Sequence, residues 1–439
     1  MATFTPSVIS KDSYNVCLVS HKFPILGRAT DHGFLWPIAK GLAQKGHHVT
    51  VLAGKSNVGR SEIIRDGVQV YFLQEDKPQE RSLFAKQALE KFEELHKKNP
   101  FHLVHSIDAS GIEIGFLKNK FRVAVAYDAD ATQMFQIVSI MGMVQDSIGA
   151  ILTTAIAVVY KFITTFYGGD RQLLSTANGI FVSSPQQRLM LERYYLYPDY
   201  HMYTVPYGIE IGNLSPRTES KDLRLTLGIP LSAQVAVTIS DMSETDEMKN
   251  LLLAFEKVAI KKPNAYLILI GNGPRWKEIE FDILSHALGK RVLMVGAIKD
   301  HDITDYISIA DVFVNMSART TGFEPTMIEA MAQKKVVIGS EVSAIANIIE
   351  DTVDGFLLRP ADIESLAKLL IAIFSKPEEG IPIGERARTK VTNLFDTKKM
   401  VDTIIYAYGR ILKNSGFFHF KIKDDALAND TKSKEISPS

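Results

Sequence analysis

A run of small polar residues precedes a helix that carries the carboxylate of Glu329. Residues 319–322 end in Gly322, residues 326–332 are good helix formers, and the apolar residues 336–338 lead to Gly339. The unpaired N–H groups and the positive dipole end of a helix bind phosphate, and a carboxylate in its first turns can accept a hydrogen bond from a sugar hydroxyl. An ordinary turn between a strand and a helix would produce the same pattern. This stretch alone supports both interpretations equally.

Two glycines follow another apolar run and predict a second turn of the size of a phosphate. Residues 265–270 indicate a buried strand, which ends at Gly271-Asn-Gly273-Pro. A backbone without side chains can approach a ligand closely. A lone Gly-x-Gly is weak evidence, so this turn gains meaning only from its surroundings.

Strands must position both turns, and the apolar pattern predicts strands that alternate with helices. Buried strands are indicated at 14–20, 47–52, 67–73, 101–106 and 122–127, and then at 234–240, 265–270, 291–296 and 310–315. This order is typical of doubly wound sheets, which bind ligands at the carboxyl ends of their strands. Proline and glycine at 206–208 suit a linker, so we place a domain boundary near Gly208.

Composition limits the possible classes of protein. A chain of 439 residues should contain more than one core. Its 50 basic and 50 acidic residues cancel, so we expect no nucleic acid partner. The single cysteine, Cys17, cannot form an internal disulfide, which fits a cytoplasmic location. We expect no secretory signal in residues 1–15, and no catalytic metal, because no His, Cys and Asp cluster has metal-ligand spacing.

Seven short segments between residues 227 and 360 resemble, in order and spacing, the nucleotide-sugar-binding half of family 4 glycosyltransferases. They are 227–230, 248–250, 269–274, 310–314, 322–323, 329–332 and 354–360. These glycosyltransferases are retaining enzymes of the GT-B fold. The resemblance implies an α/β chain of two Rossmann-like, doubly wound parallel-sheet domains with a cleft between them. The acceptor-side domain covers 1–208 and receives crossing helices at 397–423. The nucleotide-sugar-binding domain covers 209–396, and the polar tail 424–439 is expected to be disordered.

The same resemblance implies the chemistry and its residues. A hexose would pass from a nucleoside diphosphate, such as a UDP- or GDP-sugar, to a hydroxyl of a glycan, lipid-linked or protein acceptor, with retention and without a cofactor. Lys249 would stabilise the departing diphosphate, Glu329 would hold the ribose, and Asp128 would face the sugar. The other expected donor-binding residues are Gly27, Gly273, Thr320, Thr321, Gly322 and Phe323. Asp128 is equally suited to cap a helix, Lys249 to a solvated helix start, and Gly27 to a plain turn.

Several residues depart from the family pattern. Tyr127 stands where the family often has a histidine, and acidic residues fill 241–247, where the family usually has an arginine. An ungapped alignment replaces the first of the family's two glutamates by Thr321, whereas a rival alignment uses Glu324. These departures keep open a noncatalytic GT-B subunit that stabilises or steers a partner glycosyltransferase. A third possibility is that the chain is a GT-B enzyme of the epimerase or phosphorylase type.

The apolar segment 131–169 allows three interpretations. It could form buried helices between domains or in a homodimer. It could present a surface to a lipid-linked acceptor, with peripheral contact at the inner face of the membrane. It could also span a membrane, although Lys161 and the flanking acids Asp146 and Asp170 dilute its hydrophobicity.

Overall fold

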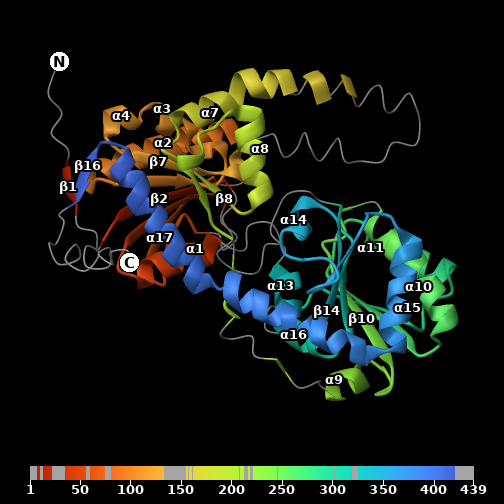
Figure 1. The fold of residues 1–439 in the computed structure, drawn as a ribbon. Coiled ribbons are helices and arrows are strands. Elements are labelled where there is room, and N and C mark those ends of the chain that lie inside the picture. Colours follow the sequence, from red (N-terminus) through yellow and green to blue (C-terminus); the bar gives the residue numbers. More distant parts are fainter. Residues whose placement is uncertain are drawn as a thin grey trace, which may run out of the picture.

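The protein has two domains, each built on one sheet, and the strands are parallel except for one edge pair of the first sheet (Figure 1). The computed structural model describes residues 7–9, 13–21, 35–55, 60–74, 81–132, 155–156, 158–160, 162–206, 208–211, 216–217, 221–244, 246–299, 302–318 and 325–420. The prediction of two Rossmann-like parallel sheets is confirmed.

The first domain contains an eight-stranded sheet in the order β4-β5-β3-β2-β6-β7-β8-β9. Only the β4–β5 pair, at one edge, is antiparallel. The central strand β2 is buried at every position, because a parallel sheet is covered by helices on both faces. The strands are β2 Asn15–Ser20, β3 His48–Lys55, β4 Glu62–Arg65, β5 Val68–Gln74, β6 Leu103–Ser106, β7 Ala124–Asp128, β8 Gly179–Val182 and β9 Met202–Thr204.

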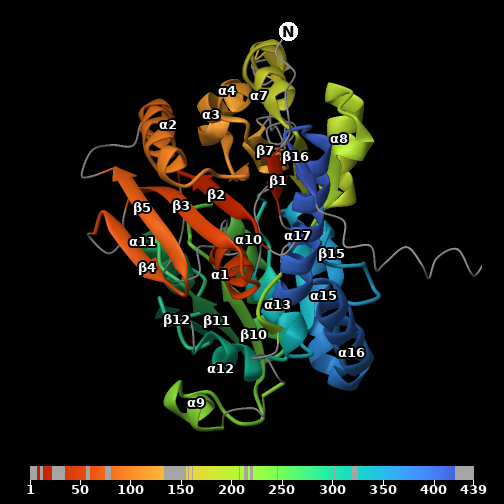
Figure 2. The ribbon, with the colours of Figure 1, turned by 90° about the vertical axis from the view of Figure 1, so that its left-hand side faces the viewer.

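Helices cover both faces of this first sheet (Figure 2). Side chains of α1 and α17 pack on one face, and side chains of α2, α3, α7 and α8 pack on the other. The helices are α1 Leu35–Gln44, α2 Arg81–Lys98, α3 Ile112–Phe116, α4 Lys118–Phe121, α7 Asp170–Thr176, α8 Pro185–Tyr195 and α17 Thr397–Asn414.

The second domain contains a six-stranded parallel sheet in the order β12-β11-β10-β13-β14-β15. Side chains of α10, α11 and α15 pack on one face, and side chains of α12, α13, α14 and α16 on the other. The strands are β10 Gln234–Ile239, β11 Ala265–Ile270, β12 Val292–Gly296, β13 Val312–Asn315, β14 Val336–Ser340 and β15 Phe356–Leu358. The helices are α9 Lys221–Thr226, α10 Glu247–Lys261, α11 Trp276–Ser285, α12 Ile303–Ser308, α13 Pro325–Ala332, α14 Ser343–Ala346, α15 Ile363–Ser375 and α16 Pro377–Leu394.

The last long helix, α17, returns to the first domain. Figure 1 shows α16 and α17 as a blue band that crosses from the second domain to the first. Met400, Ile404, Tyr408 and Ile411 recur at helical spacing on α17, and all four are buried against the first sheet and α1. Asp396 caps the helix, because its carboxylate accepts a hydrogen bond from the N–H of Lys398 (2.9 Å).

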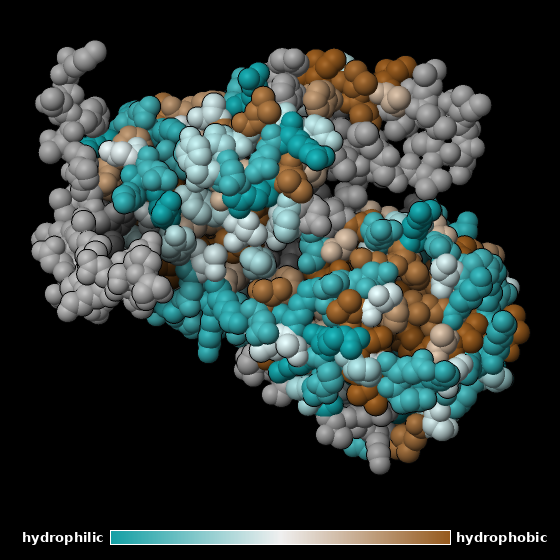
Figure 3. Space-filling model, viewed as in Figure 1, coloured by the Kyte–Doolittle hydropathy of each residue, from teal (hydrophilic) through white to brown (hydrophobic). Residues whose placement is uncertain are grey.

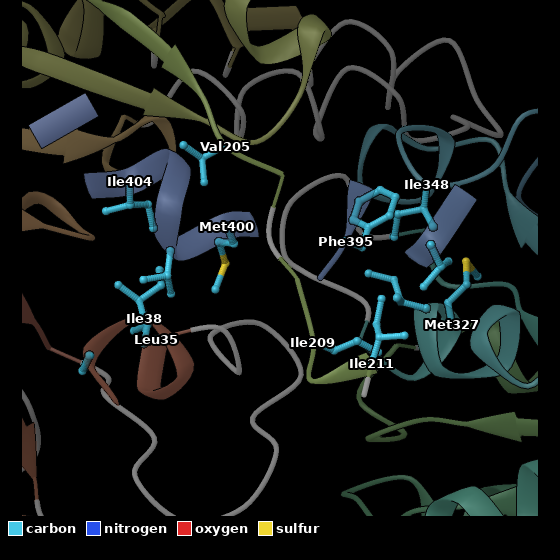
Figure 4. Close-up of a cluster of buried hydrophobic side chains, with 14 of the residues drawn as sticks. Leu35, Ile38, Val205, Ile209, Ile211, Met327, Ile348, Phe395, Met400 and Ile404 are labelled. Carbon is cyan, nitrogen blue, oxygen red and sulfur yellow. The ribbon is translucent and has the colours of Figure 1, made fainter. Parts of the chain in front are cut away.

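The two chain segments that connect the domains are hydrogen-bonded to each other. The N–H of Ile209 donates to the carbonyl of Phe395 (2.9 Å), and the N–H of Thr397 donates to the carbonyl of Ile209 (3.1 Å). Gly208 is required here, since a Cβ atom at this position would lie 2.5 Å from the Phe395 carbonyl oxygen. Side chains of both domains bury these connecting segments (Figure 4).

The two ends of the described chain lie side by side. β1 Ser7–Ile9 pairs in parallel with β16 Phe418–Phe420. The predicted tail at 424–439 lies outside the described residues.

Part of the apolar segment 131–169 is helical. Its described residues from 155 to 164 are helix, and Thr165–Gly169 forms one π-helical turn before α7. Residues 133–154, 157 and 161 lie outside the described ranges. Within those ranges, no helix combines the length and the hydrophobicity that a membrane span needs.

Candidate functional site

Each sheet has one point at which its strand order reverses. The reversal lies between β10 and β13 in the second domain and between β2 and β6 in the first. Doubly wound sheets bind ligands at such a point, outside the carboxyl ends of the strands. The segments that begin at Ser240 and Met316 therefore border the candidate donor site. His21 and Ile107 begin the corresponding segments of the first domain.

Glu329 lies inside the second domain. It belongs to α13, whose eight residues are all buried, and its exposed fraction is 3%. Five of the predicted donor-binding residues, Gly27, Thr320, Thr321, Gly322 and Phe323, lie outside the described residues, and their roles stay predictions. The role of Glu329 at a ribose also stays a prediction.

Lys249 lies in the first turn of α10, close to the carboxyl end of β10. Its side chain is exposed and forms no hydrogen bond or ion pair with any residue that the structure describes. The ammonium is therefore available to an anion at the strand-order reversal. Whether it meets a diphosphate stays a prediction.

Gly271 and Gly273 pack against protein backbone. A Cβ atom at Gly271 would lie 1.9 Å from the carbonyl oxygen of Ser240, and one at Gly273 would lie 1.8 Å from the carbonyl oxygen of Asp241. Gly271 also has a φ of +124°, which side chains disfavour. The glycines thus let the turn after β11 touch the segment after β10. This contact is a structural reason for both glycines that does not need a ligand.

The acidic stretch 241–247 is largely turned toward hydrogen-bond donors of the protein. Glu247 is buried and accepts from the hydroxyl of Ser240 (2.7 Å). Asp241 accepts from the N–H (3.1 Å) and the hydroxyl (2.7 Å) of Ser243. These contacts give two of the acids local partners inside their own segment.

Glu244 reaches across the strand-order reversal. One carboxylate oxygen accepts from the Ser317 hydroxyl, and the other accepts from the N–H of Ala318 (2.7 Å). Ser317 and Ala318 lie in the segment after β13, whereas Glu244 lies in the segment after β10. Sequence reasoning identified the acidic stretch but not this contact between two loops.

Asp128 is buried in the first domain, with an exposed fraction of 1%. Its Oδ1 atom lies 3.1 Å from Nε2 of His105, and Nδ1 of His105 lies 2.8 Å from the hydroxyl of Tyr408 on α17. Asp128 precedes the 3₁₀ turn Ala129–Ala131 but makes no side-chain cap bond to it, so the capping interpretation is wrong. Its role at a transferred sugar stays a prediction.

His105 and Tyr408 were missed by sequence reasoning. A histidine within the apolar run 103–106 and a tyrosine on the buried stripe of α17 were the available signals. Burial and the negative charge of Asp128 raise the pKa of Tyr408 well above its usual value, so its phenol stays protonated.

Tyr127 faces the opposite side of β7 from Asp128, as alternation along a strand requires. Its hydroxyl lies 3.0 Å from Oγ1 of Thr176. Burial raises the pKa of Tyr127. Tyr127 therefore lies in the core under α2, α3 and α7.

The helical residues near 160 expose a hydrophobic face. Ile156, Val159, Tyr160 and Ile163 are 63%, 57%, 71% and 51% exposed, and their spacing places them on one side of a helix. Figure 3 shows this surface in brown at the upper edge of the first domain. The described part of 131–169 therefore includes an exposed apolar face as well as the buried Thr165.

The part of the chain that the structure describes contains no group of three His, Cys, Asp or Glu side chains placed to hold a metal ion.

Comparison with known proteins agrees with this architecture. Residues 220–390 match the family model described as glycosyl transferases group 1. N-acetyl-alpha-D-glucosaminyl L-malate synthase of Bacillus anthracis is 27% identical over 201 residues, which cover 45% of this chain and 52% of that protein. Alpha-monoglucosyldiacylglycerol synthase of Acholeplasma laidlawii is 30% identical over 182 residues, which cover 40% of this chain and 44% of that protein. The chain thus spans about half the length of these curated relatives.

A solved structure extends the similarity to both domains. The Anabaena protein HepE, determined in complex with UDP and glucose, superposes with a TM-score of 0.66 at 16% identity. The superposition covers 90% of this chain and 99% of HepE. At this identity the likeness concerns the fold alone. Residues 220–390 thus match the model of group 1 glycosyl transferases, and the two domains of the chain have the GT-B fold.

Proposed function

We propose that this protein is a retaining, family 4-like glycosyltransferase that moves a hexose from a nucleoside-diphosphate sugar to a hydroxyl acceptor. The match of residues 220–390 to group 1 glycosyl transferases carries the proposal. The complex of HepE with UDP and glucose supports a UDP-sugar as the first donor to test.

Lys249 is the proposed contact for the donor diphosphate. Its exposed ammonium, without a described protein partner, lies where α10 begins beside the carboxyl end of β10. A lysine acts on phosphates as a compact point charge, so it needs no fixed fork geometry. Glu329 is the proposed ribose contact.

A lipid-linked acceptor is the acceptor class that the surface favours. The apolar face formed by Ile156, Val159, Tyr160 and Ile163 would contact the inner face of a membrane peripherally. One relative is named as a synthase of a glucosyldiacylglycerol. Co-sedimentation with phosphatidylglycerol vesicles tests this part: binding that Ile156→Asp and Tyr160→Asp abolish would support it, and equal binding by wild type and variants would contradict it.

A thermal-shift panel of UDP, GDP and ADP with their glucose derivatives tests donor binding. A ligand at a hundred times its Kd stabilises the folded state by about 2.7 kcal/mol, so a true donor must raise the Tm. The nucleotide released during turnover then separates a transferase, which frees the nucleoside diphosphate, from a phosphorylase, which yields a sugar phosphate. NMR of the product anomer tests retention.

A noncatalytic GT-B subunit is the second candidate. The carboxylate of Glu244 at the strand-order reversal favours it, because a negative charge there opposes a diphosphate. No Tm shift with any nucleotide of the panel would favour this candidate over the enzyme.

A further inference from the structure

The carboxylate of Glu244 joins the two segments between which the second sheet reverses its strand order. One of its oxygens accepts from the Ser317 hydroxyl, and the other accepts from the N–H of Ala318 (2.7 Å). Both donors lie two and three residues beyond the end of β13. The carboxylate therefore fixes the direction in which the chain leaves that strand.

Neighbouring contacts make this exit rigid. The N–H of Ser317 donates to Oδ1 of Asn315 (3.0 Å), and the side chains of Asn315 and Ser317 are each 2% exposed. Three consecutive donors are therefore hydrogen-bonded: the N–H and the hydroxyl of Ser317, and the N–H of Ala318. The carboxylate accepts from two of them at once through its two oxygens.

The first domain repeats the arrangement with other residues. Asp108, which follows β6, accepts from the N–H of His21 (2.8 Å) through one oxygen and from the N–H of Ser110 (2.9 Å) through the other. His21 directly follows β2. In both domains a carboxylate thus binds the first residues beyond a strand at the point where the order reverses.

We propose that Glu244 is a positioning residue of the donor site, which sets the backbone of residues 317–318 for nucleotide binding. This inference rests on the proposed function, since it requires that the reversal in the second sheet binds a nucleotide. Glu244 acts through Ser317 and Ala318 and need not touch the ligand. Both of its oxygens accept hydrogen bonds from the segment after β13, so the carboxylate is oriented toward that segment.

The same sheet offers a matched control at its opposite edge. Oδ2 of Asp311 accepts from the N–H of Val235 (2.7 Å). Asp311 precedes β13 and Val235 lies in β10, so this carboxylate joins the same two strands at their amino ends. Loss of either carboxylate removes hydrogen bonding between β10 and β13 or the segments next to them. Only Glu244 lies beyond the carboxyl ends of these strands, where doubly wound sheets bind ligands.

Isothermal titration with UDP on the full chain tests the role. The experiment requires that the wild-type protein binds UDP. We expect Glu244→Ala to raise the Kd for UDP about tenfold, Glu244→Gln to recover most of the affinity, and Asp311→Ala to bind UDP like wild type. Ser317→Ala keeps the contact between Glu244 and the N–H of Ala318, so it should give an intermediate Kd. This variant tests the same role if Glu244→Ala does not fold.

Three outcomes would overturn the inference. Unchanged UDP binding by Glu244→Ala would show that the carboxylate does not contribute to the donor site. Tighter binding would show that its negative charge repels the diphosphate. Equal losses in Glu244→Ala and Asp311→Ala would make it a structural bond only. If wild type binds none of UDP, GDP and ADP, the proposed function itself fails and the positioning role falls with it.

Discussion

Nε2 of His105 lies 3.1 Å from Oδ1 of Asp128, and both side chains are 1% exposed. If Nε2 carries the ring proton and donates to the carboxylate, Nδ1 is free to accept the hydroxyl proton of Tyr408 (2.8 Å). A single tautomer of the His105 ring thus satisfies both bonds. The chain of bonds attaches α17, which arrives from the second domain, to the centre of the first sheet.

Tyr408→Phe should destabilise the first domain by about 1–3 kcal/mol, because it leaves Nδ1 of the buried His105 without its hydrogen-bond partner. Tyr127→Phe is the matched control. It removes a buried phenol on the next strand, but Thr176 still donates its hydroxyl to the Leu173 carbonyl (2.8 Å), so its cost should be lower. Urea unfolding midpoints measure both. Equal midpoints would show that the bond to His105 contributes no more than an ordinary buried hydroxyl.

Stability should fall in mild acid because three histidines accept backbone N–H groups through Nδ1. His47 accepts from Tyr14, His96 from Phe101, and His102 from Asn15, each at 3.0 Å. Burial lowers the pKa of each below its ordinary value of 6.5. In the unfolded chain they bind protons more readily, so the free energy of unfolding is level above pH 7 and decreases as the pH falls through 6.5.

His102→Asn isolates one of these contributions. The amide oxygen of asparagine can accept the same N–H without titrating. Urea unfolding at pH 8 and pH 5.5 should therefore show a smaller acid loss in the variant than in wild type. An identical pH dependence would exclude His102 as a source of the acid sensitivity.

Gly273→Ala should destabilise the second domain by about 3 kcal/mol, the upper end for overpacking, because the new methyl group meets the backbone oxygen of Asp241 at 1.8 Å. Backbone can move away only if the whole segment shifts. Gly289→Ala is the control, since its methyl group would make an ordinary 3.6 Å contact with Leu284. Thermal unfolding of the two variants measures the difference, and a neutral Gly273→Ala would show that the two turns are not in firm contact.

Lys249→Ala should leave the Tm unchanged and weaken UDP binding about tenfold, because the side chain has no described protein partner but is near the donor edge. The difference between wild type and variant should shrink at high salt. Lys261→Ala removes the same charge from the other end of α10, about 18 Å away, and should bind UDP normally. If both variants bind UDP equally well, the diphosphate does not meet Lys249.

Cys17 should not react with Ellman's reagent in the native protein at pH 8. It is fully buried on β2, and burial raises the pKa of its thiol well above the usual value, so little thiolate forms. In guanidinium chloride the thiol should react completely. Rapid labelling of native protein would show that β2 opens without global unfolding.

The sheets were predictable because parallel strands covered on both faces are continuous apolar runs. β2, β7 and β10 each follow such a run in the sequence, and the helix that carries Glu329 follows from its composition. The repeated order of strand, loop and helix then predicts that ligands bind at the carboxyl ends of the strands.

The contacts between distant residues were not predictable from local pattern. His105 and Tyr408 are 303 positions apart, and Glu244 and Ala318 are 74 apart, so nothing nearby in the sequence marks either pair. Gly273 is predicted to let a ligand approach, and the structure shows that it lets the chain of Asp241 approach, so its contact with a donor stays a prediction. Glycine spacing shows that something approaches closely but not what approaches.

The pairing of β1 with β16, together with the return of α17, has a consequence during synthesis. A ribosome completes the second domain before it has made the helix and strand that the first domain needs. Until residue 420 has emerged, one face of the earlier sheet is covered by α1 without α17, and the apolar residues of α1 that pack against α17 stay exposed. The later domain is therefore the one able to fold first, and the earlier one must wait for it.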